Sequence, residues 1–148
     1  MPVYNTFCPG CTRASAAQNS AARLIGGATF HYMAALKRCQ ALTGKKPSKQ
    51  AKRKLQLLWG HLALKLMDEA SLIDPQLLAV LNENANWGRA ETSKLDPADF
   101  ADYPFGNILM QIMLGDFMQW NPVRSHTLLE AFLKGVDVTV RGSPPTKN

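Results

Sequence analysis

Apolar residues recur at helical spacing over most of the chain, and turn-forming residues divide that pattern into segments. Residues 3–7 alternate between apolar and polar types and are compatible with a short strand. Thr12 can cap a helix over 13–25, which Gly26 would end. A second helix is predicted over 29–42. The start of the chain therefore predicts one terminal strand followed by two helices.

The longest helical pattern begins at a proline–serine pair. Pro47 and Ser48 open a helix that would run over 47–70. The apolar positions of this segment form one stripe at helical spacing, made by Leu55, Leu58, Trp59, Leu62 and Leu66. At a rise of 1.5 Å per residue such a helix would be about 36 Å long, which is long for a domain of this size.

Aspartate–proline pairs mark two further helix starts. Asp74 can cap a helix whose first residue is Pro75, and Trp87 is expected to follow its end. Asp96, again followed by proline, predicts a short turn that runs through Asp102. Both starts rest on a local interaction, the capping of free backbone N–H groups.

The C-terminal third contains a long apolar segment and a capping box. Residues 105–120 are apolar nearly all round, which is typical of a buried central helix or of a helix covered by a partner. Thr127 and Glu130 fit a capping box, and the helix that they start should end near Gly135. Residues 136–140 alternate and predict one short strand.

These elements predict a mainly α fold, a bundle of five or six helices with short strands only at the two termini. The 148 residues (16.3 kDa) predict a single domain over 1–148, with a tail at 142–148. With 46% hydrophobic and 19% charged residues the chain is neither disordered nor fibrous. No run of 18 apolar residues predicts a membrane span, and three cysteines do not make a disulfide scaffold.

Charge divides the chain into a basic and an acidic part. Residues 1–67 contain 11 Lys and Arg and no Asp or Glu. Residues 68–148 contain all 11 acidic residues and the other six basic ones, so that +11 and −5 give the formal charge of +6. Such asymmetry favours an anionic partner for the first part, or a self-complementary assembly in which the two parts meet.

The basic residues concentrate around one predicted helix start. Cations near a helix N-terminus oppose the helix dipole by roughly 0.3–1 kcal/mol each, so stability alone does not explain them. Because the free N–H groups add to the positive potential, we expect this region to attract phosphate. The predicted nucleic-acid-binding residues are Lys37, Arg38, Lys45, Lys46, Lys49, Gln50, Lys52, Arg53 and Lys54.

The helices over 29–42 and 47–70 would also form a hairpin like that of a helix-turn-helix protein. Gln50 and Arg53 would then lie on the first turns of the second helix and are the candidates for reading bases. Two alternatives remain for the basic surface. It can dock on an acidic protein or an anionic lipid surface, or it can be a solvated face without a partner.

Cys8 and Cys11 have the spacing of half a zinc site, because a CxxC turn lets two thiolates face one ion. Cys39, His31 and His61 are the nearest candidates for the missing ligands, and no second CxxC is present. The same pair also fits a thiol–disulfide site, although the expected βαβ units are not predicted. We favour two reduced cysteines at a tight turn, and we predict no cofactor, with zinc as the alternative.

The sequence contains no G-x-x-x-x-G-K-[ST], G-x-G-x-x-G or H-E-x-x-H motif, and its three histidines have no nucleophile motif nearby. We therefore predict that the protein is not an enzyme. The favoured function is a small non-catalytic helical protein of a larger assembly, whose basic N-terminal half binds nucleic acid through phosphate contacts. A virus particle, a packaging machine or a ribonucleoprotein would be such an assembly.

The alternative is an accessory structural subunit of a large organellar or membrane-associated complex, docked on acidic protein or anionic lipid. Nucleic acid and other protein subunits are the expected partners, in an oligomeric assembly, and a membrane would be contacted only at its surface. The expected location is intracellular or in a virion. A retained mitochondrial location is the alternative, because residues 12–25 are rich in Ala, Ser and Arg and free of acids.

Overall fold

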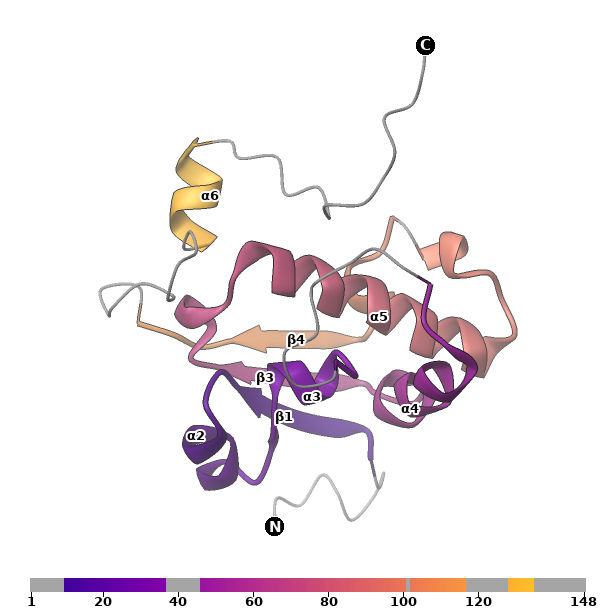
Figure 1. Ribbon diagram of the computed structural model, residues 1–148, viewed down its shortest axis with the longest axis horizontal. Helices are drawn as coiled ribbons and strands as arrows, with labels where there is room; N and C mark the ends of the chain where they lie inside the picture. The colour runs from indigo at the N-terminus through magenta and orange to yellow at the C-terminus, as the bar shows by residue number, and fades with distance from the viewer. Residues whose placement is uncertain (1–9, 37–45, 101, 117–127, 135–148) are drawn as a thin grey trace.

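A parallel β-sheet forms the centre of the computed structural model, which describes residues 10–36, 46–100, 102–116 and 128–134. The sheet has four strands in the order β2-β1-β3-β4. The strands are β1 (Thr12–Ala16), β2 (Ala28–Thr29), β3 (Leu64–Asp68) and β4 (Met110–Met113). All three strand pairs are parallel, so the carboxyl ends of the strands lie at one edge (Figure 1).

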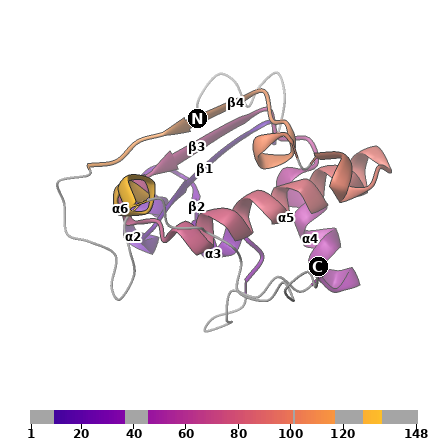
Figure 2. The same cartoon turned by 90° about the horizontal axis from the view of Figure 1, so that it is seen from above.

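The helices are α2 (Asn19–Leu24), α3 (Phe30–Met33), α4 (Lys49–Trp59), α5 (Pro75–Ser93) and α6 (Leu128–Lys134). Three 3₁₀ helices, Ala70–Leu72, Pro97–Phe100 and Pro104–Gly106, follow β3 and α5. The long helix α5 crosses one face of the sheet and packs against α4 (Figure 2). The described part of the chain is therefore an open parallel sheet with its helices α3, α4 and α5 packed in one core cluster.

Three helix starts were predictable from capping residues. Ser48 caps α4, with its Oγ accepting a hydrogen bond from the N–H of Ala51 at 3.3 Å. Asp74 caps α5, with its Oδ1 accepting from the N–H of Gln76 at 2.6 Å, and Pro75 is the first helical residue. The short turn after Asp96 is the 3₁₀ helix Pro97–Phe100. These predictions are confirmed, although α5 continues through Trp87 to Ser93.

The core lies between the sheet and the helices and centres on Trp59, which is fully buried. The indole Nε1 of Trp59 donates a hydrogen bond to the backbone carbonyl of Met33 at 2.9 Å. Its ring stacks against Phe105 at a centroid distance of 6.3 Å. Gly88 lets α5 approach α4 closely, because a Cβ there would lie 2.5 Å from the carbonyl oxygen of Leu55.

The predicted mainly α bundle is wrong, and the segment 47–70 shows why. Its helix ends at Trp59, and Leu64–Asp68 forms the central strand β3. Leucines at alternate positions satisfy both a helical stripe and a strand, so the apolar pattern does not separate the two. The pairing with β1 and β4, which are distant in sequence, decides for the strand.

Other predicted helices are also wrong in part. The segment 13–25 begins as strand β1 and becomes helical only at Asn19. The segment 29–42 contains the four-residue helix α3, and Ala35 has a φ of +53°, which a helix cannot accommodate. The apolar segment 105–120 contains β4, an edge strand in which Met110, Ile112 and Met113 are exposed, so the predicted buried helix is wrong there.

The predicted helix after Thr127 is confirmed as α6. The predicted terminal strands at 3–7 and 136–140, like the tail at 142–148, lie outside the described residues. Within the described ranges, no helix combines the length and the apolar content that crossing a bilayer requires.

Candidate functional site

The carboxyl edge of the sheet brings together the ends of β1, β3 and β4. The backbone N–H of Leu114 donates to Met67 O at 2.8 Å, and that of Ala70 donates to Leu114 O at 2.8 Å. Gly115 packs against the turn after β3, where a Cβ would lie 2.7 Å from the amide nitrogen of Ser71. This close contact holds the exposed Asp116 at the same edge as the end of β3.

Two adjacent carboxylates, Asp68 and Glu69, follow the central strand. Oδ1 of Asp68 accepts a hydrogen bond from the N–H of Glu69 at 2.9 Å. Oε2 of Glu69 accepts one from the N–H of Gln18, which follows β1, at 3.3 Å. Both side chains are half-buried, and neither forms an ion pair with a cation of the described residues. The carboxylates are thus held at the edge by backbone donors and keep acceptor capacity for a ligand.

Glu69 has a left-handed backbone conformation, with φ of +54° and ψ of +36°. For a residue other than glycine this conformation costs roughly 1–2 kcal/mol. Backbone strain of this kind concentrates at functional sites. Here it turns the chain sharply after β3 and leaves Glu69 beside the end of β1.

The edge between β1 and β3 is the point where the chain changes direction across the sheet. The chain proceeds from β1 to β2 on one side, whereas β3 lies on the other side of β1. In open parallel sheets, ligands bind outside the carboxyl ends of the strands at such a switch point. Asp68, Glu69 and the backbone of Gln18 occupy this position.

The basic surface predicted from the sequence lies on α4, near the other end of the sheet (Figure 1). Lys46, Lys49 and Arg53 are exposed and form no ion pair with a carboxylate of the described residues. Gln50 is also exposed, and Lys54 lies over the ring of Tyr32 at 4.2 Å. The basic surface of α4 is defined here as Lys46, Lys49, Lys52, Arg53 and Lys54.

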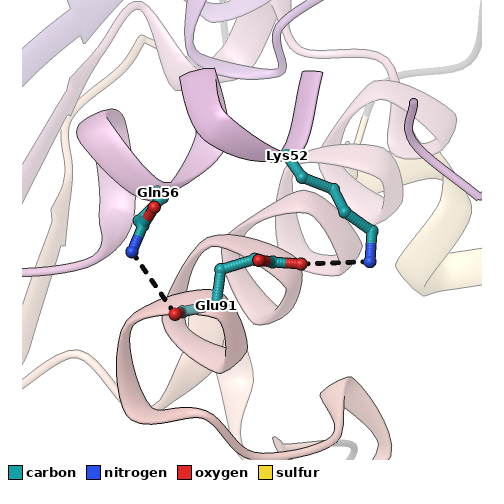
Figure 3. Close-up of polar contacts among 3 residues, drawn as sticks. All are labelled: Lys52, Gln56 and Glu91. Carbon is teal, nitrogen blue, oxygen red and sulfur yellow. Dashed lines mark hydrogen bonds and ion pairs between the residues drawn. The ribbon is translucent and has the colours of Figure 1, made fainter. Parts of the chain in front are cut away.

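Lys52 differs from its neighbours because it has a carboxylate partner. Its Nζ lies 3.0 Å from Oε1 of Glu91 on α5, and the Gln56 side chain donates to the Glu91 carbonyl at 3.3 Å (Figure 3). The ammonium of Lys52 also lies 4.2 Å from the ring centroid of Trp87. One predicted phosphate ligand is therefore already neutralised within the chain.

The remaining predicted site residues are placed only in part. Lys37, Arg38, Lys45 and Cys8 lie outside the described residues. Cys11 is disulfide-bonded, so its sulfur is not a free thiol in this structure, and the favoured prediction of reduced cysteines is wrong at Cys11. No cluster of three or more His, Cys, Asp and Glu side chains suited to a metal ion occurs in the described ranges. The predicted helix hairpin is not formed by α3 and α4, because α3 has only four residues.

Sequence reasoning missed Asp68 and Glu69. Both were counted as part of the acidic half of the chain, and the pattern that marks them is an acidic pair directly after alternating leucines. In open parallel α/β sheets the ligand site lies at the switch point, and here two carboxylates occupy that position. The fold therefore places the chain in the class of open parallel α/β proteins.

Comparison with known proteins agrees with that class, although no protein-family model matches the chain. The ATP-dependent DNA helicase PIF6 of Trypanosoma brucei brucei is 28% identical over 134 residues, which are 90% of this chain and 16% of that protein. The Pif1 helicase of Candida albicans has a similar structure, with a TM-score of 0.59 and 25% identity over 94% of this chain and 29% of its own.

A Pif1 of Bacteroides bound to single-stranded DNA has a TM-score of 0.54 and 21% identity, over 82% of this chain and 26% of its own. At that identity the likeness shows the fold alone. This chain therefore spans about a sixth of the curated relative and less than a third of each of these solved structures.

These similarities correct the predicted function. The predictions of a small non-catalytic structural protein, of an all-α virion subunit and of no enzymatic activity are wrong, because the sequence matches part of an ATP-dependent DNA helicase and the fold is similar to that of a Pif1 helicase. The carboxylates come together at the carboxyl edge only because Leu64–Asp68 is a strand and not a helix. The prediction of no cofactor is not tested by any of these findings.

The residues at the edge fit Mg²⁺ better than they fit a whole nucleotide. Mg²⁺ is usually bound by one or two carboxylates together with water and substrate phosphates, which Asp68 and Glu69 match. The backbone loop that cradles phosphates in many nucleotide hydrolases has the pattern G-x-x-x-x-G-K-[ST]. This pattern does not occur in the 148 residues, so they do not supply a loop of this type.

Proposed function

We propose that this chain is a segment of an ATP-dependent DNA helicase and supplies part of its nucleotide-hydrolysing site and part of its DNA-binding surface. The observation that carries the proposal is the acidic pair at the switch point, in a chain that matches a DNA helicase over 90% of its length. The phosphate-binding loop would come from polypeptide outside the chain.

Asp68 and Glu69 would hold Mg²⁺ with its waters. Mg²⁺ held there would supply neutralisation of phosphate charge and a bound water of lowered pKa. The role of this chain is to hold the two carboxylates in place. The backbone N–H groups of Gln18 and Glu69 do this by donating hydrogen bonds to Glu69 and Asp68. The sharp turn at Glu69 sets them against the end of β1, where a phosphate group can approach the sheet.

The basic surface of α4 would contact DNA phosphates. Residues 46–67 contain no acidic residue. Within the described residues, no carboxylate forms an ion pair with Lys46, Lys49 or Arg53. The curated relative acts on DNA, and a Pif1 of the same fold is bound to single-stranded DNA, which supports DNA as the partner. Gln50 and Arg53 remain the candidates for base contacts.

DNA as a substrate also agrees with an intracellular location. Virion and mitochondrial locations, further protein subunits and contact with a membrane surface stay predictions from the charge pattern alone. The zinc alternative at Cys8 and Cys11 stays a prediction as well, and it requires the disulfide at Cys11 to be reduced to a thiolate.

The hydrolytic part of the proposal is tested on the longest natural polypeptide that carries this segment. DNA-stimulated ATP hydrolysis should fall about 100-fold or more in Glu69→Gln and in Asp68→Asn. Asp102→Asn removes an exposed carboxylate between α5 and β4 and should hydrolyse ATP normally. Mn²⁺ binding measured by electron paramagnetic resonance should weaken in the first two variants and not in the third. Normal hydrolysis by both edge variants would overturn the proposal.

The DNA-binding part is tested by fluorescence anisotropy with labelled single-stranded DNA at several salt concentrations. Replacing Lys49 and Arg53 by Gln should weaken binding and lower the slope of log K against log salt by about 0.7 per lost phosphate contact. Arg23→Gln removes one positive charge from α2 and should leave the slope unchanged, so it is the matched control for Lys49→Gln and Arg53→Gln taken one at a time. Equal slopes in all variants would show that α4 does not contact DNA.

A further inference from the structure

A groove of about 430 Å³ lies between α4 and the C-terminal end of α5. It is called the Trp87 groove here and is lined by Lys52, Trp87, Glu91, Lys94, Leu95 and Asp96, among others. Because α5 runs from the carboxyl edge of the sheet back toward the amino ends of the strands, the groove lies at the opposite end from Asp68 and Glu69 (Figure 1). It is therefore separate from the acidic pair at the carboxyl edge, and it borders the basic surface of α4 through Lys52.

The groove has an aromatic surface that is covered by a movable cation. Lys52 lies over the Trp87 ring at 4.2 Å and contacts Glu91 at 3.0 Å, and its side chain is 30% exposed. An exposed ion pair and an exposed cation–π contact are each weak. Lys52 can therefore leave the ring when a ligand offers a better partner for both the ring and the ammonium.

The charges around the groove indicate what that ligand is. Lys49 lies one turn before Lys52 on the same face of α4, and Lys94 follows α5 on the other side; both are exposed. Of the two acids in the lining, Asp96 accepts a hydrogen bond from the N–H of Ala98 at 2.9 Å and so serves the turn. Lysines beside an aromatic ring are the combination that binds a single nucleic-acid strand, with phosphates on the cations and a base on the ring.

We propose that the Trp87 groove extends the DNA-binding surface of α4, and that a base of single-stranded DNA stacks there on Trp87 in place of Lys52. The released ammonium of Lys52 then contacts the neighbouring phosphate, together with Lys49. Glu91 opposes this exchange, since it holds Lys52 in the free protein and repels the phosphate in the complex. This inference rests on the proposed function, because it takes DNA as the ligand.

The proposal gives opposite signs for two substitutions in one ion pair. Lys52→Gln should weaken binding because it removes a phosphate contact, whereas Glu91→Gln should tighten binding about threefold because it frees Lys52 and removes a repulsion. A pair with a merely structural role would weaken binding, or leave it unchanged, on loss of either partner. The two variants therefore distinguish an ion pair that opposes DNA binding from one that only stabilises the structure.

The stacking itself is tested with a fluorescein-labelled oligothymidine of about 12 nucleotides, followed by anisotropy. Trp87→Leu should lower the affinity about tenfold, and Trp87→Phe, which keeps a ring, should lower it less than threefold. An abasic oligomer of the same length should bind the wild type and Trp87→Leu equally. Circular dichroism and thermal unfolding establish whether each variant is folded. If Trp87→Leu does not fold, the conservative variant Trp87→Phe still tests the proposal.

The outcomes distinguish the groove from the proposed function. If the wild type does not bind oligothymidine, the DNA-binding function itself fails. If the wild type binds and loses affinity on replacement of Lys49 and Arg53, while Trp87→Leu and Glu91→Gln bind as the wild type does, only the groove inference is overturned. In that case the groove takes no DNA, and a protein segment becomes the alternative occupant.

Discussion

Lys65 on β3 lies opposite Arg13 on β1 in the parallel register of the two strands. Both side chains face the helix layer, because Arg13 Nη2 donates to the carbonyl of Leu57 at 3.0 Å and Lys65 Nζ lies 5.9 Å from the Trp59 ring. Lys65 is fully buried and hydrogen-bonds Ser15 Oγ. Burial, and to a lesser extent the nearby Arg13 guanidinium, lower the pKa of Lys65 from 10.5 to about 7.

This lowered pKa predicts that the protein becomes more stable as the pH rises above 7. Between pH 7 and 10.5 the unfolded chain binds more protons than the folded one at Lys65. The free energy of unfolding therefore increases with pH in this window, by up to about 1.4 kcal/mol per pH unit, and is lowest below pH 7. Urea unfolding at a series of pH values measures the slope.

Lys65→Met isolates the contribution of this side chain. Methionine has a similar volume and no charge, so the variant should be more stable than the wild type at pH 6 by about 1–4 kcal/mol. Its stability should also depend less on pH above 7. Lys49→Met, at an exposed position on α4, should keep the slope of the wild type. If Lys65→Met retains the full slope, another group is responsible.

Gly88 predicts an unusual response to alanine. In most helix interiors alanine is more stable than glycine by roughly 0.5–1 kcal/mol. At Gly88 the new Cβ would lie 2.5 Å from Leu55 O and 2.8 Å from Trp59 Cβ, so α4 and α5 must move apart. We expect Gly88→Ala to destabilise the protein by about 1–3 kcal/mol in urea unfolding.

Ser93→Ala at the exposed end of α5 is the matched substitution for Gly88→Ala, and it should change stability by less than about 0.5 kcal/mol. A Gly88→Ala protein that is as stable as the wild type would mean that the two helices have room to separate. The Trp87 groove lies between the same two helices. We therefore expect a Gly88→Ala variant of changed stability to have a changed affinity for DNA as well.

The predictable part of the fold is the part determined by local interactions. Ser48 and Asp74 cap their helices through hydrogen bonds to residues two or three positions later, so the sequence alone contains both partners. The strands have no such local partner. Leu64–Asp68 becomes a strand because β1 and β4 lie on either side of it, and both are more than 40 residues away in sequence.

The candidate site depended on the same distant contacts. Leu62 and Leu66 extend the helical stripe of α4 into the segment that forms β3, although this segment is a strand with Lys65 buried in the sheet. A helix over 47–70 gives Asp68 and Glu69 no carboxyl edge on which to lie. The basic residues of α4 were predictable because they concentrate in one stretch of sequence, and their exposure follows from the amphipathic pattern of that helix.

Arg89 connects three parts of the structure and should be important for stability. Its Nε donates to Gly106 O at 3.1 Å, and its Nη1 donates to Gly60 O at 3.0 Å and to Leu62 O at 3.4 Å. Arg89→Met leaves these carbonyls without their donor and should cost about 2–4 kcal/mol in urea unfolding. Arg89→Lys can keep one contact and should cost less. Arg23→Met, on the surface of α2, is the control.

Glu69 allows the function of the carboxylate to be separated from its effect on stability. Its φ of +54° strains any residue with a Cβ by roughly 1–2 kcal/mol, whereas glycine adopts this conformation freely but loses roughly 0.5–1 kcal/mol in entropy. These two effects nearly cancel, so Glu69→Gly should change the free energy of unfolding by less than about 1 kcal/mol. Glu83→Gly, in the middle of α5, should destabilise by about 1 kcal/mol.

The activities of the same two variants should follow the opposite order. Glu69→Gly lacks the edge carboxylate, so Mn²⁺ binding and ATP hydrolysis should fall as they do in Glu69→Gln although the protein remains stable. Glu83→Gly keeps the edge intact and should retain both properties at temperatures well below its unfolding transition. A marked destabilisation by Glu69→Gly would mean that the Glu69 side chain contributes to folding beyond its 3.3 Å contact with Gln18. The strained turn at Glu69 would then no longer support a function for this residue.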